Sequence, residues 1–504
     1  MLFFKAARLA PVAIVLALLS ACGGDEDSPA APRVTAEAPI AGPTPFIALV
    51  KLDGDAIAGA ASVRFQIAPK PGSVSKPVSV TYSVDYLGRH GRVTTSPAGL
   101  TVPVFGLYAG RDNQVTLQVR FASGQAVDVP VTITTAAWVD PHAVYDHPTI
   151  VQARSANAAL GFDFLYMKSV YGSPVVIDTD GEVRWVGPAG AVPSASLDYD
   201  NGGFVIGSSG AGDIYRMEFD GSYGITGSLA TTGVTAFAHD IEAGKTGLIG
   251  NVDGNIAGVF QLESTAQEFK ADGSTIAFWD MAKAVSDVMT AGGDDPALFV
   301  RPGADWFHMN TAIYDAADDS VIISSRENFI VKVDYQTGAI RWIIGDPTKY
   351  WYTFPSLRGK ALTWVGDALV PIGQHSISLL PDGSLMLFNN GHESANQPAG
   401  TPTGQSRAYS AVSDYVIDEA AGTVREAWRF DHGQTILSIV CSSARQSANG
   451  SLLIDYAVAE NLTATRIVGT DPSHAVVFDF RYPTTGCNTA WNSQILPLEA
   501  LEID

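Results

Sequence analysis

Three histidines occupy matching positions in three successive segments of the sequence. His239 lies in FAHDIEAGKTGLIGNV, His308 in FHMNTAIYDAADDSVIISS and His375 in GQHSISLLPDGSLMLFNN, and a Gly- or Asp-containing turn follows each. Residues that share a position in a repeated unit share a place in the fold, so we expect the three imidazoles to converge. Imidazole titrates near neutral pH, which suits nucleophilic attack, proton transfer or metal binding.

Two further polar side chains accompany His308. Asn310 follows it by two residues, and Arg326 ends the next apolar run, DDSVIISSR. Because that run returns antiparallel after the turn, it should bring Arg326 back beside His308. A guanidinium would repel a metal ion, whereas Arg, Asn and imidazole together suit a tetrahedral oxyanion. The spacing therefore predicts an anion site, with no metal and no cofactor.

Other interpretations of the three histidines stay open. They could be polar residues that fill a channel, or a three-histidine metal site like those of catalytic zinc enzymes. The remaining histidines do not share the repeated position and are expected in loops or at the surface; they are His90, His142, His147, His392, His432 and His474.

Short apolar runs that repeat from about residue 145 must position these side chains. They are GSPVVID, GGFVIGSS, TGLIGNV, DSVIISS, DGSLMLF and NGSLLIDYA, and four further turns lead into strands ending at Trp185, Trp279, Trp342 and Trp428. Six such units without a long amphipathic helix predict a six-bladed β-propeller over residues 141–504. Its inner strands should carry the three histidines at one end of the central channel. The best short-helix candidate is 278–293.

Residues 45–140 show a different pattern. Alternating apolar runs, from FIALVKL to VDVPVTITTAAW, are separated by turn residues. This spacing is typical of a small antiparallel β-sandwich. The predicted fold class is therefore all-β, with an N-terminal β-sandwich domain followed by the propeller.

Residues 1–22 have the pattern of an export signal. Lys5 and Arg8 precede an apolar run that is too short to span a membrane comfortably. The run ends in Leu-Ser-Ala-Cys, which resembles a bacterial lipobox and implies lipidation of Cys22; an ordinary signal peptide with an incidental Cys is the alternative. Residues 23–44 should form a flexible tether. We expect a periplasmic protein held to the membrane only by its lipid, and Gly23 favours the outer membrane.

The net charge limits the classes of partner, and the cysteine count bears on a disulfide. The 504 residues include 31 Lys and Arg against 52 Asp and Glu, a net charge of −21, which argues against nucleic acid because basic patches supply most of that affinity. A local pocket can still be positive on an acidic protein, so small anions are not excluded. Beyond Cys22 only Cys441 and Cys487 remain. In an oxidising compartment this pair predicts a disulfide, and two buried free thiols are the alternative.

The motifs DWFHMN, DDSVIISSR, VDYQTGAIRWIIGDP and GQHS before FNNG resemble the bacterial PAPS-independent arylsulfate sulfotransferases. The resemblance covers most of the chain, including PVFGLYAGRDNQV near the N-terminus. It implies a six-bladed propeller that moves a sulfuryl group from an aryl sulfate donor to a phenolic acceptor through a sulfo-histidine. His375 corresponds to the nucleophile, while His308, Asn310, Arg326 and His239 correspond to residues that bind sulfate or stabilise the transition state.

The chemistry of these side chains agrees with sulfuryl transfer. The reaction spreads negative charge over non-bridging oxygens, which fixed donors stabilise, and a covalent intermediate gives ping-pong kinetics. Two departures from the family pattern concern the acceptor: Glu327 replaces the usual His after the arginine, and FNNGHESANQPAG replaces an Asp- and Gly-rich stretch. The sequence leaves a homodimer open.

Three rival functions remain. QTGAIRW preceded by Asp334 matches the docking repeat of quinoprotein dehydrogenases, which use eight blades and often an adjacent Cys pair that this sequence lacks. A non-enzymatic surface propeller that binds glycans or other ligands would not need His, Asn and Arg at one channel end. A propeller-type polysaccharide lyase would usually add a metal.

Overall fold

The computed structural model describes residues 32–171, 174–190, 196–256 and 258–504. Cys22, the expected lipidation site, lies outside the described residues, as does the whole expected export signal. Within the described ranges, no helix combines the length and apolarity needed to cross a membrane.

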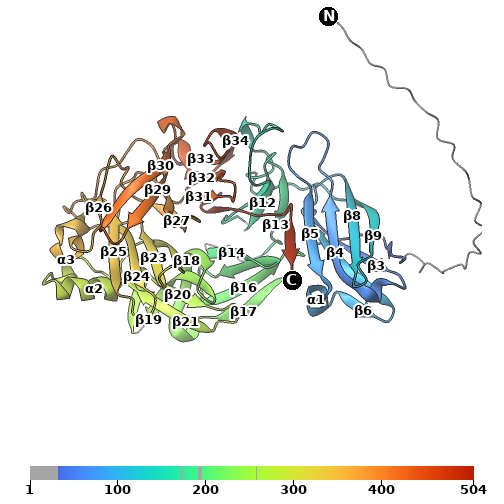
Figure 1. Ribbon diagram of the computed structural model, residues 1–504, viewed down its shortest axis with the longest axis horizontal. Helices are drawn as coiled ribbons and strands as arrows, with labels where there is room; N and C mark the ends of the chain where they lie inside the picture. The colour runs from blue at the N-terminus through green and yellow to red at the C-terminus, as the bar shows by residue number, and fades with distance from the viewer. Residues whose placement is uncertain (1–31, 172–173, 191–195, 257) are drawn as a thin grey trace, which may run out of the picture.

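Six β-sheets form a ring beside an N-terminal sandwich (Figure 1). From the centre outward, the strands are β35 (Ser493–Ile495), β11 (Phe164–Met167), β12 (Val175–Asp178) and β13 (Val183–Val186) in blade 1; β14 (Ser196–Asp200), β15 (Gly203–Gly207), β16 (Asp213–Glu218) and β17 (Tyr223–Ser228) in blade 2; and β18 (Val234–Ala243), β19 (Leu248–Ile256), β20 (Val259–Phe269) and β21 (Thr275–Asp280) in blade 3.

The other three blades follow the same order. Their strands are β22 (Met309–Asp315), β23 (Ser320–Ser325), β24 (Phe329–Asp334) and β25 (Ile340–Gly345) in blade 4; β27 (His375–Leu379), β28 (Leu385–Asn389), β29 (Ala411–Asp418), β30 (Thr423–Phe430) and β26 (Thr363–Trp364) in blade 5; and β31 (Ser443–Gln446), β32 (Leu452–Val458), β33 (Ala464–Thr470), β34 (Val476–Pro483) and β10 (Thr149–Gln152) in blade 6. The predicted six-bladed propeller is confirmed by this sheet topology.

The ring is closed by strand exchange at both ends of the propeller sequence. β35 comes from the C-terminal part of the chain and pairs antiparallel with β11, so it supplies the inner strand of blade 1. β10 comes from the start of the domain and pairs with β34 at the outer edge of blade 6. Closure therefore uses backbone hydrogen bonds in two sheets rather than side-chain packing alone.

The repeated apolar runs form the second strand of a blade in five of the six blades. In blade 1 the run GSPVVID forms β12, which is the third strand, because β35 occupies the inner position and shifts the count by one. The tryptophan-ended runs form fourth strands in all four blades concerned, and Trp185 and Trp279 are fully buried between blades.

The N-terminal domain consists of two five-stranded sheets. One holds β1 (Thr35–Ala36), β2 (Ile40–Ala41), β3 (Ile47–Asp53), β7 (Ala98–Phe105) and β6 (Val93–Thr95); the other holds β9 (Ala126–Thr134), β8 (Asp112–Phe121), β4 (Ala60–Ile67), β5 (Val78–Ser83) and β36 (Leu501–Ile503). Two expected boundaries change. Part of the expected tether 23–44 is ordered, because β1 and β2 pair with β3. The C-terminal β36, expected in the propeller, pairs parallel with β5.

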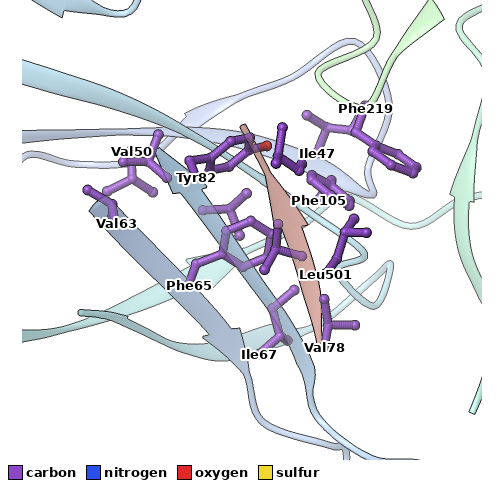
Figure 2. Packing of buried hydrophobic residues seen from close by; sticks show 14 of the residues in the cluster. Ile47, Val50, Val63, Phe65, Ile67, Val78, Tyr82, Phe105, Phe219 and Leu501 are labelled. Atoms are coloured by element: carbon purple, nitrogen blue, oxygen red, sulfur yellow. The ribbon is translucent and has the colours of Figure 1, made fainter. Parts of the chain in front are cut away.

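The sandwich and the propeller share one hydrophobic core (Figure 2). Phe65 and Phe105 pack edge to face inside the sandwich, and Phe105 stacks on Phe219 of the propeller with ring centroids 4.2 Å apart. Leu501 of β36 is buried in the same cluster. Aromatic stacking and apolar burial on this scale fix the two domains to one another.

Short helices fill connections around the sheets. They are α1 (Val84–Arg89), α2 (Met281–Ala291), α3 (Pro355–Arg358), α4 (Ala459–Leu462) and the 3-10 turns η1 (Ile57–Gly59), η2 (Ala230–Thr232), η3 (Pro296–Leu298), η4 (Tyr350–Thr353) and η5 (His432–Gln434). The helix expected within 278–293 is confirmed as α2. Asp280 caps it by accepting a hydrogen bond from the backbone N–H of Lys283, and Met281, Val285 and Met289 form its buried face.

Candidate active site

Each inner strand that contains or directly follows a predicted histidine is interrupted by a β-bulge. The register shifts beside His239 in β18, at Asn310 in β22 and after His375 in β27. His239 and His308 have φ of 52°, and Ser376, which follows His375, has φ of 53°. Left-handed backbone is costly for residues other than Gly, and it clusters where function requires a side chain to be re-aimed.

The three histidines converge, as the blade alignment predicted. The ring centroids of His239 and His308 lie 4.7 Å apart, and those of His308 and His375 lie 6.5 Å apart. A cavity of about 370 Å³ beside them is lined by His239, Asn310 and His375 among others. His308 and Arg326 are not among its lining residues.

His375 is buried, and its ring is held in one orientation by Asn390. Nδ1 of His375 lies 2.8 Å from the carboxamide Oδ1 of Asn390 and 3.0 Å from the carbonyl oxygen of Gly373. The Asn390 Nδ2 donates to the carbonyl oxygens of Ser438 and Cys441, at 2.8 and 3.0 Å, which fixes the carboxamide with its oxygen towards His375. Two acceptors at Nδ1 place the proton on that nitrogen and leave the Nε2 lone pair free.

The surroundings keep His375 neutral. Burial, and then the nearby charges of His308, His239 and Arg326, hold the pKa of His375 well below its usual range. A neutral imidazole with a free nitrogen lone pair is a competent nucleophile. Asn390 was not predicted as a site residue, although the FNNG motif that contains it was recognised at the end of the strand.

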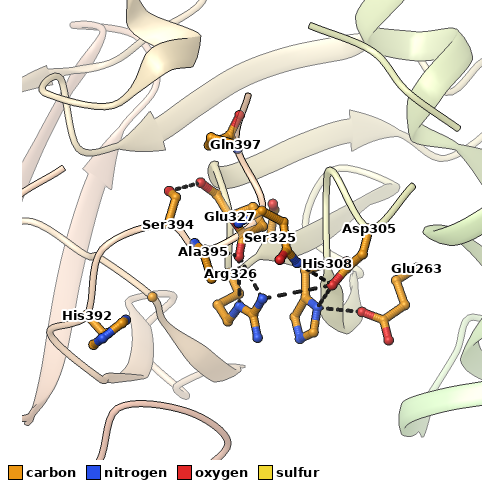
Figure 3. Close-up of polar contacts among 12 residues, drawn as sticks. Glu263, Asp305, His308, Ser325, Arg326, Glu327, His392, Ser394, Ala395 and Gln397 are labelled. Carbon is orange, nitrogen blue, oxygen red and sulfur yellow. Dashed lines mark hydrogen bonds and ion pairs between the residues drawn. The ribbon is translucent and has the colours of Figure 1, made fainter. Parts of the chain in front are cut away.

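The pKa of His308 is shifted in the opposite direction to that of His375. Its Nδ1 lies 2.8 Å from Oδ2 of Asp305 and 2.5 Å from Oε2 of Glu263 (Figure 3). Burial opposes protonation, but the hydrogen bonds to Asp305 and Glu263 outweigh it, so the pKa of His308 is raised above its ordinary value. The site therefore holds one neutral and one readily protonated imidazole side by side.

Glu263 projects from β20, the third strand of blade 3, to the histidines of two inner strands. Its Oε2 lies 3.3 Å from Nε2 of His239, and its own backbone has φ of 47°. Burial raises the pKa of the Glu263 carboxyl, but the two histidines outweigh it and hold that pKa far below its usual range. No pattern in the sequence marked Glu263, because a third-strand residue reaches the channel only through this unusual backbone conformation.

The ligand atoms of His239, Glu263 and His308 lie within 4.8 Å of one another, so these three residues could hold a metal ion. Two imidazoles and a carboxylate suit several divalent metals. The Arg326 guanidinium is also close, with Nη2 3.9 Å from Oδ2 of Asp305, and it would oppose a cation. The sequence-based expectation of no metal remains a prediction.

Arg326 returns to His308, as the hairpin predicted. Its backbone N–H donates to the carbonyl oxygen of His308 at 3.1 Å. Its guanidinium donates through Nε and Nη2 to Oε1 of Glu327, at 3.0 and 2.7 Å. Glu327 is fully buried, so two of the five N–H donors of Arg326 are committed to a buried carboxylate and the other three are left for an anion.

The two sequence features that depart from the family pattern are in direct contact, because Glu327 binds the backbone of the divergent segment FNNGHESANQPAG. Its Oε1 accepts a hydrogen bond from the backbone N–H of Ala395, at 3.3 Å, and its Oε2 accepts one from that of Asn396, at 2.8 Å. The Asn396 side chain then donates to Oδ2 of Asp305, at 2.5 Å. Figure 3 shows the 394–397 segment against Glu327 and Arg326, with His392 apart from this network. The Glu327 carboxylate thus connects the divergent loop to Arg326. The same loop reaches His308 through Asn396 and Asp305.

Three cavity-lining residues have a buried polar atom without a hydrogen-bond partner among the described residues. These atoms are Asn310 Oδ1, Ser376 Oγ and Trp491 Nε1. The Asn310 amide is fixed by its Nδ2, which donates to the carbonyl oxygen of Gln374 at 2.7 Å. Buried polar atoms are normally paired, so a group of unpaired ones around a cavity indicates a polar ligand.

The predicted disulfide is confirmed. Cys441 and Cys487 are bonded, with Cα atoms 6.5 Å apart, and both residues line the cavity. Cys441 and Ser442 have φ of 56° and 78°, so the disulfide anchors a left-handed turn whose Cys441 carbonyl holds Asn390. The bond therefore belongs to the site rather than to a distant loop.

Comparison with known proteins agrees with the geometry. The family model described as arylsulfotransferase (ASST) matches residues 150–492, and the model of the arylsulfotransferase Ig-like domain matches residues 39–136. An arylsulfate sulfotransferase of Lelliottia amnigena is 24% identical over 84% of both chains. Another, from Escherichia coli, is 29% identical, but that alignment spans only 32% of this chain and 29% of the relative.

Among solved structures, the Cps50 (Swd1) β-propeller domain of Myceliophteria thermophila aligns with a TM-score of 0.35 and 10% identity, covering 66% of this chain and 88% of that one. The family model spans more than half of the sequence and contains every residue predicted for catalysis or substrate binding. The chain belongs to the arylsulfotransferase family.

Proposed function

We propose that the protein transfers a sulfuryl group from an aryl sulfate to a phenol, with His375 as the nucleophile. One observation carries the proposal: the Nδ1 proton of His375 is committed to Asn390 and Gly373, which leaves Nε2 unprotonated beside a cavity where several buried polar atoms lack partners. Membership of the arylsulfotransferase family supports the class of reaction.

In the first half-reaction, Nε2 of His375 attacks the sulfur of the ester. The N–S bond forms as the bond between sulfur and the aryl oxygen breaks, and the aryl oxygen keeps the bonding electrons. His308 supplies its proton, because Nδ1 is held by Asp305 and Glu263 and the Nε2–H remains to act as the acid. The free donors of Arg326 stabilise the charge on the non-bridging oxygens.

In the second half-reaction, an acceptor phenol replaces the released one. It gives its proton to His308 while its oxygen attacks sulfur, the N–S bond breaks, and His375 recovers its lone pair. The covalent sulfo-histidine makes the kinetics ping-pong. The sulfuryl group comes from the ester itself rather than from PAPS, and the cavity of about 370 Å³, near the small end of ligand pockets, suits a single-ring ester better than a nucleotide.

The envelope location is also proposed, on the sequence alone. The lipobox-like Leu-Ser-Ala-Cys supports lipidation at Cys22 and attachment on the periplasmic side of the outer membrane. An oxidising compartment is consistent with the Cys441–Cys487 disulfide. Labelling with a radioactive or alkyne-bearing fatty acid, compared between the wild type and Cys22→Ser, tests this location.

The function is tested by incubating the purified protein with 4-nitrophenyl sulfate, with and without phenol. We expect nitrophenol release that depends on the phenol, loss of release in His375→Asn, and an adduct of one sulfuryl group on His375 by mass spectrometry. His474→Asn is the matched control, because His474 packs against Trp428 outside the site. If no phenol supports release, the transferase proposal is wrong and a non-catalytic ligand-binding propeller becomes the better description.

A further inference from the structure

The cavity beside His375 has an apolar part that the sulfate group would not use. The residues lining this part include Ala236, Ala238, Trp491 and the bonded Cys441 and Cys487. None of them carries a charge, so they offer an anion no ion pair. They are suited to an uncharged, flat group attached to that anion.

Trp491 differs from every other tryptophan in the chain. All nine tryptophans are described, and the rings of eight contact an aromatic or cationic side chain: Trp138, Trp185, Trp279, Trp306, Trp342, Trp351, Trp364 and Trp428. Trp491 has no such contact among the described residues. Its ring is therefore available to stack on a ring that enters the cavity.

The polar edge of Trp491 is also unused. Its indole N–H is buried and has no acceptor among the described residues. A buried indole N–H usually finds a partner, because leaving it unpaired costs free energy. An oxygen at the edge of a bound ring, such as the phenolic or bridging oxygen of an aryl ester, would provide that acceptor.

We propose that Trp491 and the Cys441–Cys487 disulfide form a single subsite for aromatic rings, used in turn by the donor and by the acceptor. This inference rests on the proposed function and adds the location of the aryl group to it. The ring of the aryl sulfate stacks on Trp491 while the sulfuryl group lies beside His375. Because both rings would stack on the same indole, the first phenol leaves before the second enters.

The shared subsite has a kinetic consequence. An acceptor phenol that binds before the donor blocks the free enzyme, so phenol should inhibit competitively against the aryl sulfate at high concentration. Substitution of Trp491 should raise the KM of donor and acceptor together. Separate subsites would instead give changes in one KM only.

The test uses two substitutions of the full chain. Trp491→Phe keeps a ring and removes the N–H, whereas Trp491→Leu removes both; Trp428→Phe is the control, because the Trp428 ring already packs on His474. We expect Trp491→Leu to raise both KM values about tenfold, the effect of losing one stacked aromatic contact, and Trp491→Phe to raise them less. KM values that stay unchanged in Trp491→Leu, or that change for one substrate only, would overturn the shared subsite.

Equilibrium binding of phenol, measured by calorimetry on the same variants, separates this inference from the reaction itself. Phenol binding that weakens in Trp491→Leu but not in Trp428→Phe supports the subsite even if the wild type transfers no sulfuryl group. Transfer by the wild type together with unaltered phenol binding in Trp491→Leu would leave the proposed function standing and refute the subsite. Circular dichroism of each variant confirms that binding is compared between folded proteins.

Discussion

The carboxamide oxygen of Asn390 lies 2.8 Å from Nδ1 of His375, while the amide nitrogen of the same side chain is held by two backbone carbonyls. Because an amide cannot exchange its oxygen and nitrogen without breaking those bonds, the tautomer of His375 is determined by a loop of the neighbouring blade. Asn390, Ser438 and Cys441 together thus leave Nε2 of His375 as the ring nitrogen with the free lone pair.

Asn390→Ala should therefore lower kcat about 10- to 100-fold, the loss seen when a partner that orients a functional histidine is removed. The KM for the donor should change little, because Asn390 is not among the residues that line the cavity. Steady-state kinetics with 4-nitrophenyl sulfate measure this split. Ser410→Ala removes another hydrogen bond to the Ser438 carbonyl. If it lowers kcat as much as Asn390→Ala does, the loss comes from a disturbed loop and not from the tautomer of His375.

The pH dependence of kcat/KM should reflect the opposite pKa shifts of His375 and His308. The depressed pKa of His375 keeps it neutral at and below pH 6.5, so the acid limb of kcat/KM should lie well below 6.5. The raised pKa of His308 keeps the acid protonated above pH 6.5, so the alkaline limb should lie above that value. Asp305→Asn removes a carboxylate that raises the His308 pKa and should move the alkaline limb to lower pH while the acid limb stays in place.

Glu327→Gln should disturb Arg326 and the 394–397 segment together. The carboxylate uses both oxygens as acceptors, and an amide would place a donor against either the arginine or a backbone N–H. Loss of one charge-assisted hydrogen bond predicts a fall in kcat/KM of about 10- to 100-fold. Thr401→Ala is the control within the same loop, because among the described residues its hydroxyl donates to the carbonyl oxygen of Pro398 alone. A Glu327→Gln enzyme with wild-type kinetics and acceptor preference would contradict the coupling.

Removal of the disulfide should reduce both stability and activity. The double variant Cys441→Ser/Cys487→Ser opens a connection between residues 46 apart, for which a loss of about 2–4 kcal/mol is typical. It also releases the left-handed turn whose carbonyl holds Asn390, so kcat should fall at temperatures where the variant is still folded. The thermal unfolding midpoint and kcat of the variant are compared with those of the oxidised wild type. An unchanged midpoint would show that the bond is not structural.

Chelation distinguishes an anion site from a metal site at His239, Glu263 and His308. A sulfo-histidine mechanism needs no divalent ion, so transfer should survive EDTA, and elemental analysis should find less than one metal per chain. Stoichiometric metal, and activity that is lost with EDTA and restored by one particular ion, would identify these residues as ligands. Glu263→Gln should then abolish metal retention, which can be measured without any substrate.

The sequence predicted those parts of the site that follow from repetition. The shared position of His239, His308 and His375 placed them on inner strands, and antiparallel pairing returned Arg326 to His308. Each of these predictions depends only on the order of strands within one blade. The disulfide also followed from two cysteines in a chain with an expected export signal.

The parts that were not predicted depend on contacts between blades. Glu263 reaches the channel through a left-handed residue in a third strand, and Asp305 and Trp491 lie in loops whose direction no periodic pattern reveals. Asn390 could have been inferred, because the residue after a second strand lies beside the start of the inner strand with which it pairs. The exchange of β35 and β36 was missed, since short strands late in the sequence resemble any other turn-bounded run.

Because β35 and β36 pair with strands from distant parts of the chain, both domains need residues 493–503 to complete their sheets. β35 completes blade 1 and β36 extends the sheet of the N-terminal sandwich. A product truncated before β35 would leave two open sheet edges, one in each domain, and open edges invite aggregation and proteolysis. Each domain therefore depends on the same eleven residues to complete one of its sheets, and loss of this segment would affect the sandwich and the propeller together.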